Sequence, residues 1–471
     1  MKKYIIIAAS LFFLAAVCLP VTYFRIDDMQ DQVEIKETVL AGDAAAAAGT
    51  TLRYKVFNRQ LLWDMEYKIG SQKKPKIRFR HVSVGGYNTE PVPESQAGFL
   101  TDLYGSSSSS GSIESMIDAS AKPLVFDVAK RTKKGKTRKE THLLREYYEY
   151  FPARFSVDMH GVHIAPPDAP ESYFKLPIPE DYEVRISITK NSRGDISAYS
   201  IDDAEDGLYS ESSTASTCTD SGCYVALNPS SYYQAESDTS RDIPLPADMR
   251  GIHFVPFLSY GSGDDDKWFR PDLEHARLLY PLPEGTRTLA LQKSSDGKSL
   301  YHLTKEKGGI YLSVIDIKSM KCQQTLSLPG KSASRELAVF EEDDDGNILM
   351  ILSTGRFYLL TQKGKQIEIA LSENLQSIDG LSGARPSEGT LSFDYDGRRL
   401  AMAFYNIYDI DSDSTSYLVL YDKGELQYAG CYESSLAPRD VAMEYAVTPA
   451  FAYTRGGQGL TAVDGIRVKL K

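Results

Sequence analysis

The stretch FEEDDDGNILMIL, residues 340–352, places an Asp-Gly pair between two apolar runs. The same arrangement occurs in LQKSSDGKSLYHL at 291–303 and in LSFDYDGRRLAMA at 391–403, so the three pairs lie 49 and 51 residues apart. A two-residue hairpin turn of the primed type needs positive φ angles, which Asp-Gly adopts at low cost. We therefore expect each pair to join two antiparallel strands, at Asp296-Gly297, Asp345-Gly346 and Asp396-Gly397.

Each Asp-Gly pair belongs to a repeat of roughly 50 residues that contains four short apolar runs and a Lys-Gly or similar turn. Four strands at this period are the signature of propeller blades, which must stack because one blade cannot bury both of its faces. The sequence predicts an all-β fold, a β-propeller of about seven or eight four-stranded blades over residues 51–471. Tandem immunoglobulin-like sandwiches are the alternative, but they would not explain the fixed register of the Asp-Gly pairs.

Alternating residues support β structure in the N-terminal half as well. Every second residue from Leu61 to Ile69 is apolar, and the same holds from Tyr182 to Ile188. A period of two over such lengths indicates strands with one buried face. The content of 30 Tyr and 18 Phe also favours pleated, half-buried surfaces.

A resemblance to a known family supports the same fold. SSDGKSLYHLTKEKGGIYLSVIDI (294–317) and DYDGRRLAMAFYNIYDIDSDSTSYLVLYDKGEL (394–426) resemble the repeats of bacterial WD-like β-propellers found in extracytoplasmic proteins. The similarity extends over about residues 286–437, but it lacks the proline often found before Asp-Gly and any Trp-Asp pair. The resemblance implies a propeller fold and a scaffold role, and it brings no catalytic residue with it.

The N-terminal segment has the pattern of a membrane anchor. Residues 4–24 contain no charge and follow Lys2 and Lys3. As a helix they would span ~31 Å, which matches the hydrocarbon thickness of a bilayer. The lysines predict that the N-terminus lies inside, so we expect a transmembrane anchor at 1–25 and the bulk of the chain outside the cytoplasm. A cleaved signal peptide is the alternative. Residues 26–50, mixed polar and ending in an alanine run, are predicted to be a linker.

The charge balance excludes one class of partner. The chain has 53 Lys and Arg against 64 Asp and Glu, a formal net charge of −11. Phosphate backbones need a positive surface, so nucleic acid is not an expected partner.

The cysteines fit an extracytoplasmic location. Cys218 and Cys223 flank TDSG, and a short disulfide across that loop is expected. Cys322 and Cys431 begin and end fourth strands two predicted blades apart, so we expect their Cα atoms to lie beyond the ~7 Å that a disulfide can bridge. The cysteine spacing matches no zinc pattern.

Two acidic loops are candidate metal sites. Glu341, Asp343 and Asp345 alternate as in a calcium loop, but Leu349 stands where a further oxygen ligand is needed, which favours a solvated hairpin. The loop YDIDSDSTS is the better candidate for calcium, because its length would let backbone carbonyls join the carboxylates. Its ligands would be Asp409, Asp411 and Asp413. His160 and His163 form a weaker hint, since residues three apart on a strand face opposite sides.

A basic segment stands out against the acidic whole. The sequence AKRTKKGKTRKE, residues 129–140, follows LVFDV and is predicted to be two strand ends and a turn. The favoured interpretation is a well-solvated loop, and contact with anionic lipid headgroups or an acidic wall polymer is the functional alternative. Its cations are Lys130, Arg131, Lys133, Lys134, Lys136, Arg138 and Lys139.

No motif in the sequence identifies an enzyme, since the nucleophile elbow, zinc-protease and Walker patterns do not occur. We expect a membrane-anchored extracytoplasmic β-propeller that binds a protein, peptide or glycan partner through its loops. The alternative is a surface hydrolase or lyase whose active site is assembled at the mouth of the propeller channel from residues of several blades.

Overall fold

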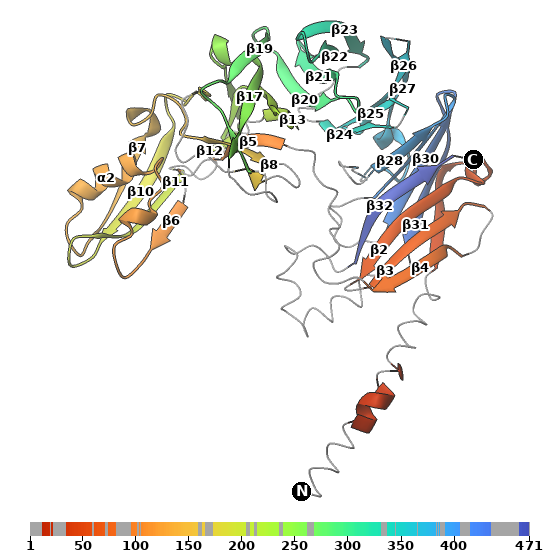
Figure 1. Ribbon diagram of the computed structural model, residues 1–471, viewed down its shortest axis with the longest axis horizontal. Coiled ribbons are helices and arrows are strands. Elements are labelled where there is room, and N and C mark those ends of the chain that lie inside the picture. Colours follow the sequence, from red (N-terminus) through yellow and green to blue (C-terminus); the bar gives the residue numbers. More distant parts are fainter. Residues whose placement is uncertain are drawn as a thin grey trace, which may run out of the picture. The chain divides into compact units, whose positions relative to one another are not determined.

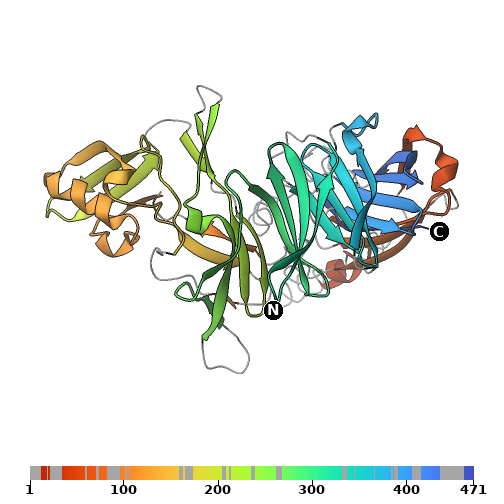
Figure 2. The ribbon, with the colours of Figure 1, turned by 90° about the horizontal axis from the view of Figure 1, so that it is seen from above.

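The computed structural model shows two compact units, unit 1 with residues 1–93 and 334–471 and unit 2 with residues 94–333 (Figure 1 and Figure 2). Both are built mainly of antiparallel sheets. The residues that the structure describes are 12–18, 20–21, 34–58, 61–70, 74–81, 96–100, 103, 105–158, 163–164, 173–203, 208–211, 214–234, 239–260, 268–330, 337–343, 345–364, 366–382, 384, 386, 391–405, 415–434 and 461–470.

Two sheets of unit 1 are simple meanders, in which consecutive strands are hydrogen-bonded neighbours. The first contains β24 (Leu337–Glu342), β25 (Ile348–Leu352), β26 (Arg356–Lys363) and β27 (Gln366–Asn374). The second contains β28 (Leu391–Tyr395), β29 (Arg399–Tyr405), β30 (Thr415–Asp422) and β31 (Glu425–Ser434). The short 3-10 helix η6 (Leu375–Ser377) follows β27.

Unit 1 is completed by pairing between the two ends of the chain. The third sheet has the order β32-β2-β3-β4, and β1 adds to the outer edge of β31. The strands are β1 (Ile35–Gly42), β2 (Thr51–Asn58), β3 (Leu61–Lys68), β4 (Lys76–His81) and β32 (Thr461–Lys469), with η2 (Ala44–Ala47) after β1. The linker predicted at 26–50 is therefore wrong over residues 35–47.

The reason for that error is that β1 is stabilised by distant residues. Lys36 forms an ion pair with Glu433 at 3.0 Å, and the Tyr428 hydroxyl donates to Glu37 at 2.7 Å. Ala47 is fully buried, in the core cluster that also contains Leu52 and Met65. A mixed polar segment followed by alanines shows none of this by itself, because its partners lie almost four hundred residues later in the chain.

The sheet of unit 1 that contains β28–β31 buries both of its faces. Along β29, Leu400, Met402 and Phe404 pack into the core shared with β24–β26, whereas Ala401 and Ala403 pack into the core shared with β2, β3 and β32. Side chains of a strand alternate between the two faces of the sheet. The large residues of β29 therefore pack against one neighbouring sheet and its alanines pack against the other. This stacking of four-stranded sheets is consistent with a propeller.

Unit 2 contains a third meander, β20 (Arg287–Lys293), β21 (Ser299–Glu306), β22 (Gly309–Asp316) and β23 (Lys321–Leu328). Its other sheets have the orders β13-β14-β17-β18-β9 with β19 on β17, β12-β15-β16 and β5-β8. Their strands are β5 (Gln96–Leu100), β8 (Arg154–Asp158), β9 (His163–Ile164), β12 (Leu208–Glu211), β13 (Thr214–Thr219), β14 (Gly222–Leu227), β15 (Ser230–Gln234), β16 (Thr239–Ile243), β17 (Gly251–Tyr260), β18 (Trp268–Pro271) and β19 (Arg277–Pro281), with η5 (Ala247–Met249) before β17.

The remaining part of unit 2, which we call the inserted module, comprises residues 103–148 and 178–203. Its antiparallel sheet has the order β6-β11-β10-β7, with α2 packed against β10. Figure 1 shows α2 lying along this sheet. The elements are β6 (Gly105–Ser108), η3 (Glu114–Met116), α2 (Lys122–Arg131), β7 (Thr137–Leu143), η4 (Leu144–Glu146), β10 (Glu183–Lys190) and β11 (Ile196–Asp203).

Helix α2 corrects two predictions, the all-β fold and the assignment of LVFDV to a strand. Pro123 stands at the start of the helix, where its missing N–H costs nothing. Leu124, Val125, Val128 and Ala129 are buried, which is the spacing of one helical face. The β-branched and aromatic residues of LVFDV resemble a strand locally, and the four-residue repeat of the buried face is visible only when the window extends to Ala129. The fold is mostly β.

The Asp-Gly pairs join the first and second strands of three successive four-stranded meanders, as predicted, and β1 extends the last of these to a five-stranded sheet. The turn type differs from the prediction. Gly297, Gly346 and Gly397 have φ angles of 68°, 79° and 87°. Among the described residues other than glycine, positive φ occurs at Lys307, Met320 and Lys423, so the aspartates do not adopt it. The loops are therefore longer turns in which the glycine alone is left-handed.

The two-residue primed turns occur instead at Lys-Gly pairs. Lys307-Gly308 joins β21 to β22 with φ angles of 47° and 84°, and Lys423-Gly424 joins β30 to β31 with 51° and 86°. At the Asp-Gly loops the carboxylate explains the longer turn. Asp396 Oδ1 accepts from the backbone N–H groups of Arg398 and Arg399 at 3.0 and 2.7 Å, a local bond that Asp favours in turns.

The inserted module also explains why the described sheets are fewer than predicted. Five sheets of four or more strands lie outside the module in the described residues, rather than seven or eight. About seventy residues that the repeat count assigned to blades belong to the module, whose core is separate. The uncharged N-terminal run is described at 12–18 and 20–21, which are helical, and no helix of the described residues is long and apolar enough to cross a membrane.

Candidate functional site

The candidate site lies where two loops of the inserted module meet, residues 132–136 after α2 and 191–195 between β10 and β11. The Gly135 N–H donates to the Asn191 carbonyl at 3.0 Å, and the Lys190 N–H donates to the Lys136 carbonyl at 3.0 Å. These backbone bonds fix one loop against the other. Gly135 has a φ of 67°, and a Cβ added there would meet nothing within 4 Å, so the turn is open to solvent at this point.

Asn191 organises the second loop. Its Oδ1 accepts from the backbone N–H groups of Arg193, Gly194 and Asp195 at 2.9, 2.9 and 3.0 Å. Gly194, with a φ of 103°, has the Lys134 side chain beside it, because a Cβ added there would lie 3.0 Å from Lys134 Cε. The loop is thus ordered by its own side chain, and it holds Arg193 close to the lysine-rich turn.

Seven cations lie on these loops or on the elements that adjoin them, α2, β7 and β10. We call them the basic tip: Lys130, Lys133, Lys134, Lys136, Lys139, Lys190 and Arg193. All are exposed except Lys190, which is half-buried. Within the described residues none of the seven has an ion-pair partner, although carboxylates outnumber cations in the chain as a whole.

The two remaining cations of the segment behave differently. Arg131 Nη2 lies 2.6 Å from Asp127 and 2.9 Å from Glu140, and Arg138 also pairs with Glu140. The side chain of Glu140 is 13% exposed, so two guanidinium groups converge on a nearly buried carboxylate. Arg138, Glu140 and His142 share the face of β7 towards this network because they alternate along the strand. These arginines stabilise the base of the tip.

His142 and Tyr147 complete the network. His142 Nε2 lies 2.9 Å from Glu140, and the Tyr147 hydroxyl donates to Asp127 at 2.8 Å. Burial would raise the pKa of Glu140, but hydrogen bonds from His142 and Arg138 and the Arg131 charge outweigh it and hold that pKa below its ordinary value. Burial and the bond to Asp127 raise the pKa of Tyr147 to about 12. Each polar group therefore satisfies another group of the same network.

The structure brings together the seven cations predicted at 130–139, but it divides them. Among the described residues, no ion-pair partner lies within reach of Lys130, Lys133, Lys134, Lys136 or Lys139, whereas Arg131 and Arg138 form ion pairs with carboxylates. Sequence reasoning missed Lys190 and Arg193. The turn residues Asn191 to Gly194 predict a hairpin after the alternating run at 182–188, but nothing in them shows that the hairpin faces the lysines.

The first acidic loop is held together by its own atoms. Asp343 Oδ1 accepts from the N–H groups of Asp345 and Asn347 at 3.0 and 2.8 Å, and Oδ2 accepts from Asn347 Nδ2 at 2.8 Å. In the described residues no group of three or more His, Cys, Asp or Glu is arranged to hold a metal ion. The other predicted ligands, Asp409, Asp411, Asp413 and His160, lie outside the described residues, as does the side chain of His163.

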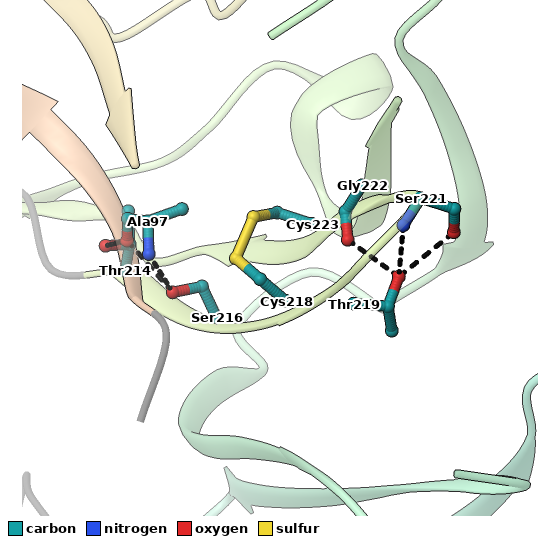
Figure 3. The surroundings of a disulfide bond; sticks show 8 residues. All are labelled: Ala97, Thr214, Ser216, Cys218, Thr219, Ser221, Gly222 and Cys223. Carbon is teal, nitrogen blue, oxygen red and sulfur yellow. Dashed lines mark hydrogen bonds between the residues drawn. A yellow bond between two sulfur atoms is a disulfide. The ribbon is translucent and has the colours of Figure 1, made fainter. Parts of the chain in front are cut away.

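Cys218 and Cys223 are joined by a disulfide, which Figure 3 shows at the end of the β13–β14 hairpin. The two residues are register partners across the hairpin, and both are buried. Beside them, Ser216 Oγ accepts from the Ala97 N–H at 2.7 Å and donates to the Ala97 carbonyl at 3.0 Å, so that β5 is fastened to β13 (Figure 3). Cys322 and Cys431 are free thiols, the first of them exposed.

Comparisons with known proteins give no family. No family model matches the sequence, and no curated protein matches it. Solved structures with a similar arrangement include the Dos1 propeller, at 14% identity and a TM-score of 0.24, covering 47% of this chain and 50% of that one. A protein from Lactobacillus plantarum is 10% identical with a TM-score of 0.25 and coverages of 62% and 95%. Apo AztD from Citrobacter koseri is 10% identical with a TM-score of 0.28 and coverages of 89% and 98%. The chain spans only half of the length of the Dos1 propeller, and all three TM-scores are low.

Proposed function

We propose that this protein is a membrane-anchored, extracytoplasmic binding or scaffold protein of β-propeller type, and that the basic tip is its contact with an anionic partner. The partner is a protein, peptide or glycan outside the cytoplasm. The observation that supports this most is a set of cations on and beside two interlocked loops that have no ion-pair partner among the described residues. Clustered like charges repel one another, and an anionic partner would remove that repulsion.

The surroundings of the tip also support binding. The chain has a net charge of −11, so an isolated positive surface attracts anions that the rest of the molecule repels. The tip belongs to a module that has its own hydrophobic core. The other sheets of unit 2 therefore need only support the module. Loops on a rigid frame are common recognition surfaces, because they vary without disturbing the frame.

Two observations support an extracytoplasmic location. The uncharged run at 4–24 with Lys2 and Lys3 before it suits an anchor whose C-terminal side is outside. The Cys218–Cys223 disulfide suits an oxidising compartment, because cytosolic thiols are kept reduced.

The exposed thiol of Cys322 offers a test of this location. A membrane-impermeant maleimide applied to intact cells is expected to label the full-length protein at Cys322. The Cys322→Ser variant, treated in parallel, reports any labelling at Cys18 or Cys431. Labelling of Cys322 only after the cells are lysed would contradict the proposal.

A surface hydrolase or lyase is the second candidate function, and one pair of residues favours it. Asp272 Oδ2 lies 2.7 Å from His275 Nδ1, and the His275 side chain is 72% exposed whereas that of Asp272 is nearly buried. A carboxylate that engages Nδ1 leaves Nε2 for a substrate, as a general base requires. Shortening of an anionic polymer by the wild-type protein but not by His275→Ala would favour this candidate over binding alone.

A further inference from the structure

We infer that the partner of the basic tip is a flexible polyanionic chain, such as a phosphate-bearing wall polymer, and not the surface of a bilayer. This inference rests on the proposed function, because it names the partner of the same site. Three features of the tip lead to it: its shape, the absence of apolar side chains from its loops, and the chemistry of its cations.

The shape of the tip favours a chain over a plane. Lys133, Lys134 and Lys136 come from one exposed turn and Arg193 comes from the adjoining turn, with Gly135 open to solvent between the lysines. A flat bilayer can touch only the side of two such turns that it faces. A flexible polymer can curl around them and bring a charge to each cation in turn.

The apolar surface expected of a membrane-binding site is missing from the tip loops. Interfacial segments combine basic residues with Trp, Phe or Leu side chains that enter the acyl boundary. The module's exposed large apolar side chain in the described residues is Met116, and it belongs to η3 rather than to either tip loop. The tip loops therefore offer charge alone, which is what a soluble polyanion needs.

The division between lysine and arginine points the same way. Guanidinium groups bind phosphate through a fixed fork of donors, whereas an ammonium group on a flexible stem acts as a movable point charge. The two arginines at the base, Arg131 and Arg138, are engaged by Glu140. Six of the seven cations of the tip are lysines. Their mobile ammonium groups suit the phosphates of a flexible chain, which are not held at fixed positions.

The size of the effect follows from counting charges. Binding of a single-stranded polyanion releases about 0.7 counterions for each neutralised charge, so the dependence of log affinity on log salt reports the number of contacts. Removal of Lys133, Lys134 and Lys136 should reduce that slope by about 2. At low salt the affinity should fall about 100-fold, if each lysine near an anionic surface contributes on the order of one tenfold step or slightly less.

The experiment uses the full-length protein in nanodiscs of neutral phosphatidylcholine, so that the predicted anchor is occupied. The probes are long-chain inorganic polyphosphate and vesicles of phosphatidylglycerol and phosphatidylcholine in equal amounts, compared at equal phosphate concentration. The test variant is Lys133→Ala/Lys134→Ala/Lys136→Ala. The control is Lys293→Ala/Lys318→Ala/Lys321→Ala, which removes the same charge from exposed lysines on the β20–β23 sheet of unit 2.

The expected result is salt-dependent binding of polyphosphate that the test variant loses and the control keeps, with weaker binding of vesicles. Tighter binding of vesicles, lost in the test variant, would overturn the flexible-chain inference and leave the proposed anionic contact in place. Equal loss of polyphosphate binding in the test variant and the control would contradict the basic tip as a binding site, and with it the proposed anionic contact. So would the failure of the wild-type protein to bind either probe.

Discussion

The three meanders β20–β23, β24–β27 and β28–β31, which we call the repeat sheets, bury their side chains differently from the inserted module. In unit 1, Leu349 and Phe357 of one sheet share a core with Met402 and Phe404 of the next, so neither sheet is complete alone. The module closes a core of its own between α2 and its sheet. Shared cores make a frame in which each sheet depends on its neighbour, whereas a closed core lets the module be modified without disturbing that frame.

The two regions also use charge differently. In the repeat sheets, acids such as Asp343 and Asp396 satisfy the backbone of their own loops. In the module, Glu140 contacts two arginines and a histidine, whereas the lysines of the basic tip have no ion-pair partner among the described residues. Charges that close a loop serve the fold, and charges that stay unpaired are available to a ligand. Substitutions in each region can test this difference.

Loss of one large side chain from the shared core should be the most damaging change. Phe404 is fully buried and stacks on Tyr417 with ring centroids 5.4 Å apart. Phe404→Ala is expected to cost about 3–5 kcal/mol of unfolding free energy, measured by denaturant titration, because it removes the side chain and leaves a cavity. Polyphosphate binding by the basic tip should persist under conditions where the variant is folded. If Phe404→Ala also abolished that binding, the frame and the module would not be independent.

Acid should weaken the β20–β23 sheet through its buried histidine. His302 is almost fully buried, with Nε2 3.0 Å from the Thr288 hydroxyl, and burial lowers its pKa from 6.5 to about 4. The unfolded chain then binds more protons than the folded one between these values, so stability falls as the pH falls from 6.5 towards 4. The expected loss is about 3 kcal/mol. Denaturant midpoints at several pH values measure it, and in His302→Leu this part of the pH dependence should be absent.

Removal of the charge at Glu140 should destabilise the base of the basic tip. Glu140→Gln leaves Arg131 and Arg138 facing each other without their shared carboxylate, at an expected cost of about 2 kcal/mol, since the carboxylate is nearly buried but the arginines are half-exposed. The pKa of Glu140 is held below 4.5, so its contribution is present above that pH and is lost as the pH falls through the lowered value. Hydrogen exchange of β7 measures the effect. Unchanged exchange would show that the network does not hold the tip.

The smallest expected change in stability concerns two nearby aspartates in one Asp-Gly loop. Asp343→Ala removes the acceptor for the Asp345 and Asn347 N–H groups and should cost about 1 kcal/mol. Asp345 is exposed, so Asp345→Ala should change stability by less than about 0.5 kcal/mol although it belongs to the Asp-Gly pair. Thermal unfolding of the two variants measures the difference. Equal losses would mean that the pair itself, and not the preceding acid, fixes this turn.

Calcium titration distinguishes the two acidic loops as candidate metal sites. If a divalent ion binds, we expect the response to be lost in Asp411→Ala and kept in Asp343→Ala, because both Asp343 oxygens already accept hydrogen bonds from their own loop. Heat release on addition of calcium measures it, and the reverse pattern would make the 341–345 run the metal site.

Local features of the sequence were sufficient for part of the fold and part of the site. The position of each Asp-Gly loop between two strands, the pairing of cysteines five residues apart and the basic run at 130–139 are visible in short windows. The turn type was not predicted correctly, because the carboxylate bonds at Asp396 depend on atoms of the loop and not on the dipeptide. Helix α2 was missed because its buried face repeats at three and four residues inside a stretch that resembles a strand.

The sequence by itself determined where the chain turns and which faces are apolar, since backbone preferences and side-chain periods act over a few residues. Tertiary structure alone decided that β1 pairs with β31, that β32 pairs with β2, and that the loop of residues 191–195 lies against the loop of residues 132–136. Such contacts join segments whose spacing in the sequence carries no signal. They are selected by the packing of whole sheets, whose many small contributions no single motif contains.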